Sequence, residues 1–243
     1  MAAENGNAAV WFVDRHVAGA AADKPAFIEA GEGGRTLTYA ELGRESGRMA
    51  ALYERFGVNR EDRVALLLLD TADFPVIFWG SLKSGVIPVA LNTLLSTEVY
   101  AAILADSRAK ALFVSPELLE TVLPALAGNP WLKHVFVAGP TEASGMSGLA
   151  AELAKGDSRP SVEADPDECA FWLYSSGSTG KPKGVRHVHS NLKATADTYG
   201  AQVLGIESSD TVYSAAKLFF AYGLGNAMTF PMSVGATTVL FSG

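Results

Sequence analysis

Apolar runs and amphipathic segments alternate along the chain between residues 63 and 137. The segment Arg63–Leu69 is apolar after its first residue and is bounded by Asp62 and Asp70, which is typical of a strand buried on both faces. Similar runs predict strands at 86–91, 110–114 and 134–137, and helical spacing predicts helices at 72–83, 97–106 and 117–126. This βαβ order predicts an α/β fold with doubly wound, largely parallel sheets and right-handed connections.

A hairpin and a capped helix are predicted ahead of this alternation. Residues 25–30 and 35–39 have the pattern of two strands around a glycine-rich turn. The helix that follows starts at a capping box, Thr38-Tyr39-Ala40-Glu41, in which the threonine and the glutamate each bind a free backbone N–H. Its apolar face is formed by Leu42, Met49, Leu52 and Phe56.

The composition changes between Gly139 and Pro166, where Gly, Pro, Ser and acidic residues accumulate around a weak helical pattern at 149–153. We interpret this stretch as a linker and predict two α/β subdomains, 1–165 and 166–243. The second should contain strands at 168–174, 185–189, 211–216 and 237–241, a helix capped by Ser190 with Leu192, Ala196, Tyr199 and Val203 on one face, and a helix at 223–232. Because this alternation is unfinished at Gly243, we expect the second sheet to be truncated before it is complete.

Composition and charge narrow the class of protein. With 243 residues, 49% hydrophobic and 19% charged, the chain is an ordinary globular sequence. A net charge of -7 disfavours a nucleic-acid partner, and the single Cys169 excludes an intramolecular disulfide. Residues 1–7 have no basic residue before a long apolar run, and the apolar stretch 64–69 is too short to span a bilayer. We therefore expect a cytoplasmic protein without a membrane partner.

A loop rich in glycine and hydroxyl groups follows the strand that ends at Tyr174. Glycines let the backbone approach an oligophosphate, hydroxyls and free N–H groups donate hydrogen bonds, and lysines supply charge. Lys181, Lys183 and Arg186 fall within six positions of an otherwise acidic chain, which indicates an anionic ligand. The predicted ATP phosphate-binding residues are Ser175, Ser176, Gly177, Ser178, Thr179, Gly180, Lys181, Lys183 and Gly184.

Two commoner phosphate-binding motifs do not fit this loop. A Walker A motif needs four residues between its first glycine and the Gly-Lys pair, whereas two separate Gly177 from Gly180, and Pro182 follows the lysine. The dinucleotide fingerprint also fails, because Gly223-Leu-Gly225 continues to Met228 where a glycine or alanine is needed.

The ten residues from Ser175 to Gly184 instead resemble the signature Ser/Thr-Ser-Gly-Ser/Thr-Thr-Gly-x-Pro-Lys-Gly of the adenylate-forming enzymes. The chain is similar to the acyl-CoA synthetase branch of that superfamily over its whole length, including the stretches 38–42, 80–89 and 217–224. Within the branch, the stretches 185–192 and 215–226 are most similar to the benzoate-CoA ligases.

This resemblance implies an ATP-dependent ligase. Such enzymes activate a carboxylic acid, here benzoate, as an acyl-adenylate with release of pyrophosphate, and then transfer the acyl group to coenzyme A. ATP, coenzyme A and Mg²⁺ are the implied cofactors, with Mg²⁺ accompanying the ATP phosphates. No metal ligands are assigned, since His187 and His189 have no third ligand near them in the sequence.

The resemblance also implies roles for particular residues. Phe220, Ala221, Tyr222 and Gly223 match the acyl pocket, although many relatives carry a histidine where Phe220 stands. From the residues alone, this apolar run suits either a flat ring at the end of a strand or ordinary core packing. Lys183 is the candidate catalytic residue, since an ammonium on a flexible loop can follow the departing pyrophosphate. A solvated surface lysine is the alternative.

Several elements that the resemblance implies have no counterpart before Gly243. They are the acidic Mg²⁺-binding segment, the ribose-binding aspartate, the hinge, and the mobile C-terminal domain with its adenylation lysine. We therefore expect the chain to be an N-terminal part of a longer enzyme and to be inactive alone. Other interpretations stay open: a ligase for another aryl or a medium-chain acid, or a nucleotide-binding module without turnover. A homodimer also stays open.

Overall fold

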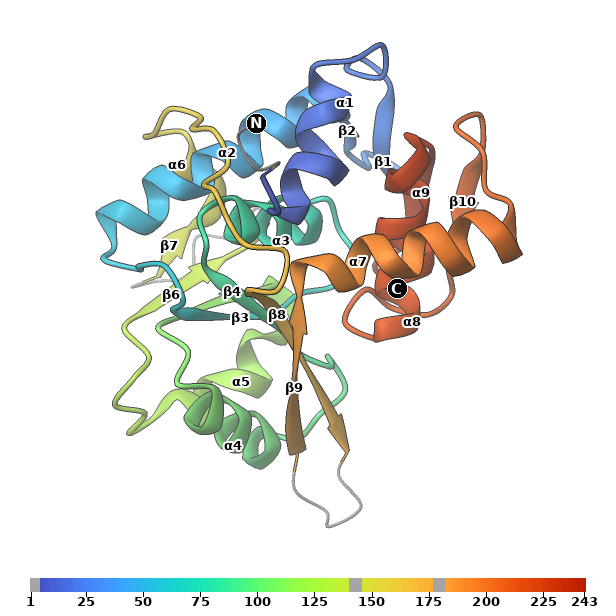
Figure 1. The fold of residues 1–243 in the computed structure, drawn as a ribbon. Helices are drawn as coiled ribbons and strands as arrows, with labels where there is room; N and C mark the ends of the chain where they lie inside the picture. The colour runs from blue at the N-terminus through green and yellow to red at the C-terminus, as the bar shows by residue number, and fades with distance from the viewer. Residues whose placement is uncertain (1–4, 140–145, 177–181) are drawn as a thin grey trace.

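The computed structural model describes residues 5–139, 146–176 and 182–243, and its strands form two sheets (Figure 1). The strands are β1 (Pro25–Glu29), β2 (Thr36–Thr38), β3 (Arg63–Leu67), β4 (Ile87–Ala90), β5 (Ala111–Val114), β6 (His134–Val137), β7 (Ser147–Gly148), β8 (Cys169–Ser176), β9 (Pro182–Val188), β10 (Thr211–Tyr213) and β11 (Thr237–Leu240). Within the described residues, the larger sheet has the order β7-β6-β5-β3-β4-β8-β9, and the smaller sheet has the order β10-β11-β1-β2.

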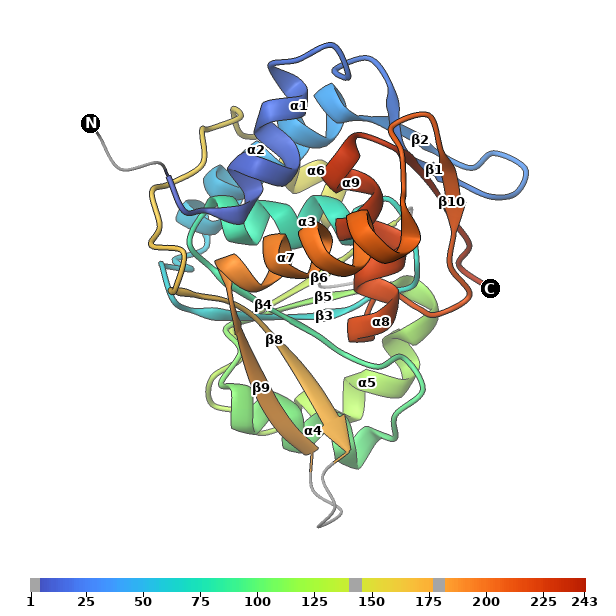
Figure 2. The same ribbon diagram turned by 45° about the vertical axis from the view of Figure 1, so that its right-hand side comes forward.

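The helices cover both faces of the larger sheet. The helical segments are η1 (Val10–Asp14), α1 (Arg15–Val17), α2 (Tyr39–Arg55), α3 (Asp73–Lys83), α4 (Thr97–Ser107), η2 (Pro116–Leu118), α5 (Leu119–Leu126), α6 (Leu149–Leu153), α7 (His189–Thr195), η3 (Ala196–Leu204), α8 (Ala221–Leu224), η4 (Gly225–Thr229) and α9 (Phe230–Val234). Figure 2 shows α2, α3 and α7 on one side of the sheet and α4 and α5 on the other.

The central strands of the larger sheet are buried on both faces, as their apolar runs predict. On β3, Val64 and Leu66 belong to the core shared with α2 and α3, whereas Ala65 and Leu67 belong to the core shared with α4 and α5. Neighbouring strands in this sheet are parallel, except that β8 and β9 pair in antiparallel fashion. The predicted doubly wound, largely parallel α/β fold is therefore confirmed.

The smaller sheet joins the two ends of the chain. The hairpin β1–β2 is antiparallel, as predicted, and β1 also pairs in parallel with β11. The described residues after 165 thus do not form a sheet of their own: β8 and β9 extend the larger sheet, while β10 and β11 belong to the smaller one. The division into subdomains 1–165 and 166–243 stays a prediction.

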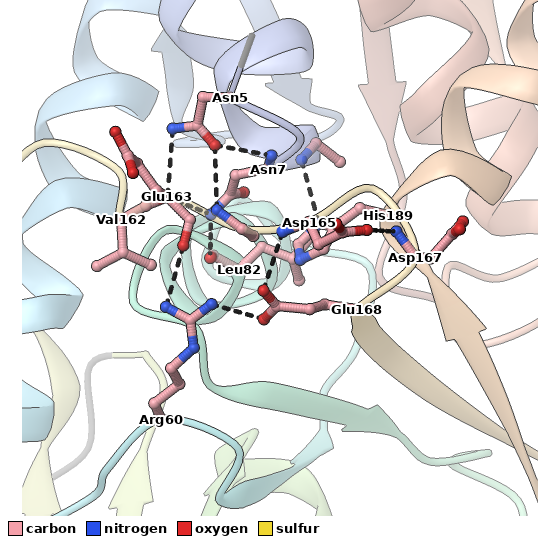
Figure 3. A network of polar contacts seen from close by, with 12 residues as sticks. Asn5, Asn7, Arg60, Leu82, Val162, Glu163, Asp165, Asp167, Glu168 and His189 are labelled. Carbon is pink, nitrogen blue, oxygen red and sulfur yellow. Dashed lines mark hydrogen bonds and ion pairs between the residues drawn. The ribbon is translucent and has the colours of Figure 1, made fainter. Parts of the chain in front are cut away.

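The segment between α6 and β8, interpreted above as a linker, is attached to the body of the protein by polar contacts (Figure 3). The buried amide of Asn7 donates to the carbonyl oxygens of Leu82 (2.8 Å) and Val162 (3.1 Å). Arg60 forms an ion pair with Glu168 at 2.5 Å. These contacts hold the linker beside the end of α3 and the N-terminal segment, and hold the residue before β8 beside Arg60.

One of the three predicted helix starts is confirmed, and the other two lie elsewhere. The capping box at Thr38 is confirmed, since Glu41 N–H donates to its hydroxyl and Thr38 N–H donates to the Glu41 carboxylate. Ser190, in contrast, lies inside α7; the residue before the helix is Val188, whose N–H donates to the side-chain oxygen of Asn191 at 3.1 Å. The helix predicted at 223–232 begins earlier, at Ala221.

The apolar face predicted on the α7–η3 segment is also only half correct. Leu192 and Ala196 are buried, but Tyr199 and Val203 are 40% and 69% exposed. The segment changes from α to π geometry at Ala196. A wider turn rotates the later residues out of the 3.6-residue register on which the prediction depended.

Candidate active site

A cavity of about 540 Å³ lies between the β8–β9 hairpin, α4 and the start of α8. Figure 2 shows α8 beside the hairpin and α4 on the far side of the sheet. The lining residues come from these elements and the segments next to them: Asn92, Leu95, Val99, Ile103, Leu173, Tyr174, Ser175, Pro182, Val185, His187, Phe219, Phe220 and Ala221. The wall is mostly apolar, and among the described residues that line it there is no carboxylate, lysine or arginine.

The two arms of the predicted phosphate loop lie side by side at this cavity. Ser175 is paired with Lys183, and the register continues to Ser176, the last residue of β8, and Pro182, the first residue of β9. Both of these side chains are exposed; Ser175 lines the cavity, and Lys183 lies on β9 outside the lining set. Of the other predicted phosphate-binding residues, Gly177, Ser178, Thr179, Gly180 and Lys181 lie outside the described residues, and Ser176 and Gly184 lie on β8 and β9.

Gly184 packs closely against the aromatic rings of β8. A Cβ at this position would lie 3.2 Å from Cζ of Tyr174 and 3.4 Å from a ring carbon of Trp172. The phenol of Tyr174 donates a hydrogen bond to the Asp106 carboxylate on α4 at 2.5 Å. Burial, followed by this carboxylate, raises the pKa of Tyr174, so the phenol keeps its proton. The ring therefore ties the stem of the loop to α4.

The four predicted acyl-pocket residues fall into two groups. Phe220 and Ala221 line the cavity. Tyr222 is 65% exposed and is outside the lining set, and Gly223 is buried in the turn itself, where a Cβ would overlap the carbonyl oxygen of Lys217. Since helical geometry at Ala221 points successive side chains in different directions, four consecutive residues cannot share one wall.

A carboxylate that the sequence analysis treats only as a strand boundary also belongs to this region. Asp70 follows β3 and is 5% exposed. Its Oδ1 accepts a hydrogen bond at 3.0 Å from the backbone N–H of Leu218, next to the cavity wall. The only signal in the sequence is a charge directly after an apolar run, which is common at strand ends.

The two histidines have separate environments. His187 lines the cavity and stacks on Phe171, with ring centroids 4.6 Å apart. His189 begins α7 and its Nδ1 accepts a hydrogen bond from Ala8 N–H at 3.1 Å. Burial lowers the pKa of both, that of His189 to about 4. Within residues 5–139, 146–176 and 182–243, no group of three His, Cys, Asp or Glu side chains is placed to hold a metal ion.

The amino-acid sequence of the chain matches the model of a known family. Residues 13–243 match the model described as "AMP-binding enzyme". The chain belongs to the AMP-binding enzyme family. The resemblance to adenylate-forming enzymes, inferred from the loop at 175–184, is thereby confirmed.

Curated relatives of this AMP-binding chain include aryl-CoA ligases. It is 45% identical over 237 residues to the 4-hydroxybenzoate–CoA/benzoate–CoA ligase of Rhodopseudomonas palustris (strain ATCC BAA-98 / CGA009), covering 97% of this chain and 43% of the relative. It is 47% identical over 223 residues to the benzoate–CoA ligase of Thauera aromatica, covering 88% of this chain and 42% of the relative. The chain thus spans less than half the length of these relatives.

Solved structures agree with this family assignment. A benzoate CoA ligase from Burkholderia xenovorans LB400 matches with a TM-score of 0.88 and 38% identity, over 98% of this chain and 45% of that chain. The anthranilate CoA ligase AuaEII in complex with anthranoyl-AMP matches with a TM-score of 0.92 and 33% identity over the same shares. Separately, none of the described helices has the length and apolar character needed to cross a bilayer.

Proposed function

We propose that this AMP-binding chain is the ATP- and acyl-binding part of an acid–CoA ligase that activates benzoate. One observation carries the proposal: Ser175 and Pro182, at the two arms of the phosphate loop, line the same cavity as Phe220 and Ala221. A carboxylic acid held against Phe220 and Ala221 therefore has its carboxylate directed toward the place where ATP phosphates would bind. Proximity of this kind is the main requirement for attack of a carboxylate on a phosphate.

The proposed reaction has two steps. A carboxylate oxygen of benzoate attacks the α-phosphorus of ATP, and pyrophosphate leaves, so that benzoyl-AMP is formed. The thiol sulfur of coenzyme A then attacks the acyl carbon, and AMP leaves with the bonding electrons. The residues of this chain proposed to bind the phosphates are those of the loop from Ser175 to Gly184, and Lys183 supplies positive charge as pyrophosphate departs. Its exposed position on β9 suits a side chain that follows a moving charge.

The apolar wall supports an uncharged aromatic ring as the acyl group. Phe220 and Ala221 present an aromatic ring and a small side chain, and neither offers a partner to a second charge on the substrate. Tyr222 and Gly223 stay part of the proposal, Tyr222 as an exposed side chain beside the cavity and Gly223 as the residue that allows the tight turn. The similarity to ligases named for benzoate favours benzoate over medium-chain acids.

Mg²⁺ would accompany ATP, where it neutralises phosphate charge. The described residues contain no group of three His, Cys, Asp or Glu side chains placed to hold a metal ion, and the proposal assigns no Mg²⁺ ligand to them. Cytoplasmic location also stays a prediction.

The test uses the full product of the gene with ATP, Mg²⁺ and coenzyme A. Benzoate, 4-hydroxybenzoate, anthranilate and octanoate are supplied separately, and acyl-CoA is quantified by chromatography. We expect benzoate to have the highest kcat/KM. Faster turnover of octanoate would contradict the aromatic assignment. ATP binding without acyl-CoA from any acid would favour the alternative, a nucleotide-binding module without turnover. A sedimentation experiment on the same sample tests for a homodimer.

A further inference from the structure

The buried carboxylate of Asp70 connects the centre of the larger sheet to the cavity wall. It lies just after β3, and its Oδ1 accepts the Leu218 N–H across 148 positions of sequence. Burial raises the pKa of this carboxyl, whereas the Leu218 hydrogen bond and the charge of Lys217 lower it. A hydrogen bond to a charged acceptor is roughly twice as strong as one to a neutral acceptor.

The segment that contains Leu218 is a compact turn held together by its own backbone contacts. The N–H of Phe220 donates to the Lys217 carbonyl at 3.0 Å, and the N–H of Leu224 donates to the Phe220 carbonyl at 2.7 Å. Gly223 packs against the same Lys217 carbonyl so closely that a Cβ would not fit. A shift of the Leu218 amide is therefore transmitted to the cavity-lining residues directly after it.

The other end of the contact is hydrogen-bonded into the larger sheet. The N–H of Leu69 donates to the Ser115 hydroxyl at 3.0 Å, and the N–H of Ser115 donates to the Leu67 carbonyl, also at 3.0 Å. These bonds connect the carboxyl ends of β3 and β5. Asp70 is thus anchored to the sheet, and its hydrogen bond connects this anchor to Leu218, directly before the cavity-lining residues.

We propose that Asp70 is a positioning residue for the acyl group. By holding the Leu218 amide, it sets the distance between the wall formed by Phe220 and Ala221 and the β8–β9 hairpin, and so decides how large a ring the cavity accepts. This role rests on the proposed function, in which the acyl group lies against that wall. A misplacement of about 1 Å in such a wall can lower the rate by roughly 100-fold.

The first test measures how strongly the backbone N–H groups of the turn are protected, without reference to activity. Hydrogen–deuterium exchange is followed by mass spectrometry on the 243-residue chain, in peptides covering residues 214–222. Asp70→Ala should raise exchange there by roughly tenfold or more, and Asp70→Asn, which keeps a neutral acceptor, by a smaller factor. Tyr53→Phe is the control, because it removes a buried hydrogen bond to Ser81 far from the turn and should leave residues 214–222 unchanged.

The second test measures selectivity in the full product of the gene. Asp70→Ala should lower kcat/KM for benzoate by roughly 10- to 100-fold while KM for ATP changes by less than about twofold. The preference for benzoate over 4-methylbenzoate should also shrink, because a loosened wall no longer penalises the added methyl group. Asp70→Asn should restore part of kcat/KM for benzoate and part of the preference for benzoate over 4-methylbenzoate.

The outcomes separate this inference from the proposed function. Unchanged exchange at 214–222 in Asp70→Ala would overturn the positioning role, and so would an unchanged ratio of benzoate to 4-methylbenzoate. If Asp70→Ala does not fold, Asp70→Asn decides: exchange equal to that of the parent overturns the proposal, and a rise confined to 214–222 supports it. If the parent makes no benzoyl-CoA, the proposed function fails, while the exchange result still shows whether Asp70 holds the turn.

Discussion

The centre of the larger sheet and the wall of the cavity both contain phenylalanine, but the two places hold it differently. Phe113 on β5 is fully buried and stacks on Phe136, with ring centroids 5.0 Å apart. Phe220 is 46% exposed and contacts Phe219 at a centroid distance of 4.4 Å. The buried ring contributes to stability through its whole surface, whereas the exposed ring is available to a ligand. A side chain of one type therefore stabilises the fold in one region and, in the proposed function, contacts the acyl group in the other.

Truncating each ring gives the largest expected difference. Phe113→Ala should lower the free energy of unfolding of the 243-residue chain by about 3–5 kcal/mol, because it leaves a cavity among buried rings. Phe220→Ala should lower it by less than about 1 kcal/mol and should weaken benzoate binding instead. Urea unfolding and calorimetric titration provide the two measurements. If both substitutions lowered the free energy of unfolding equally, Phe220 would be a core residue. That is the alternative, ordinary core packing, given in the sequence analysis.

His189, a buried residue outside the cavity lining, makes the stability of the fold depend on pH. The pKa of His189 is lowered from 6.5 to about 4 by burial, so the folded protein excludes a proton that the unfolded chain binds. Stability from this group is fully present above about pH 6.5 and is lost as pH falls toward 4, by roughly 3 kcal/mol at most. The control is His189→Asn, whose side-chain oxygen can still accept the Ala8 N–H and which should not show this loss. An identical acid transition in both proteins would refute the assignment.

Lys183 should matter for rate and not for stability. In the full product of the gene, Lys183→Ala should slow adenylation by roughly ten- to a thousand-fold, the scale for removing one charge directed at transition-state charge. Its exposed position on β9 predicts an unchanged melting temperature. Benzoate-dependent pyrophosphate exchange is the assay, with Lys193→Ala on the surface of α7 as the matched control. Exchange at the parent's rate would show that Lys183 is a solvated lysine.

The smallest expected effect comes from the contact between Tyr174 and Asp106. Tyr174→Phe keeps the ring beside Gly184 and removes only the hydroxyl, so stability should fall by about 1 kcal/mol or less. KM for ATP should rise severalfold, because the stem of the phosphate loop is no longer tied to α4. Asp106→Asn, which retains an acceptor, should show less of this rise. A change in KM for benzoate alone would place the effect on the acyl side instead.

Local patterns in the sequence determined a large part of this protein. The apolar runs at 63–69 and 110–114 predicted central strands because a strand buried on both faces must be apolar throughout. Thr38 and Glu41 predicted a helix start because capping depends on residues three positions apart. The loop at 175–184 indicated the family because phosphate binding demands particular residues at fixed spacing, and that spacing is visible without a fold.

The tertiary structure decided which distant segments meet. Pairing of β1 with β11 depends on backbone hydrogen bonds between the two ends of the chain, and no local pattern contains that information. The same holds for Asp70 and Leu218, since a buried amide can be satisfied by any acceptor that the fold brings near it. The direction of Tyr222 depends on where helix α8 begins, at Ala221, and one residue of difference in a helix start turns a side chain by about 100°. Packing therefore decided which of the four residues predicted for the acyl pocket line the cavity, namely Phe220 and Ala221.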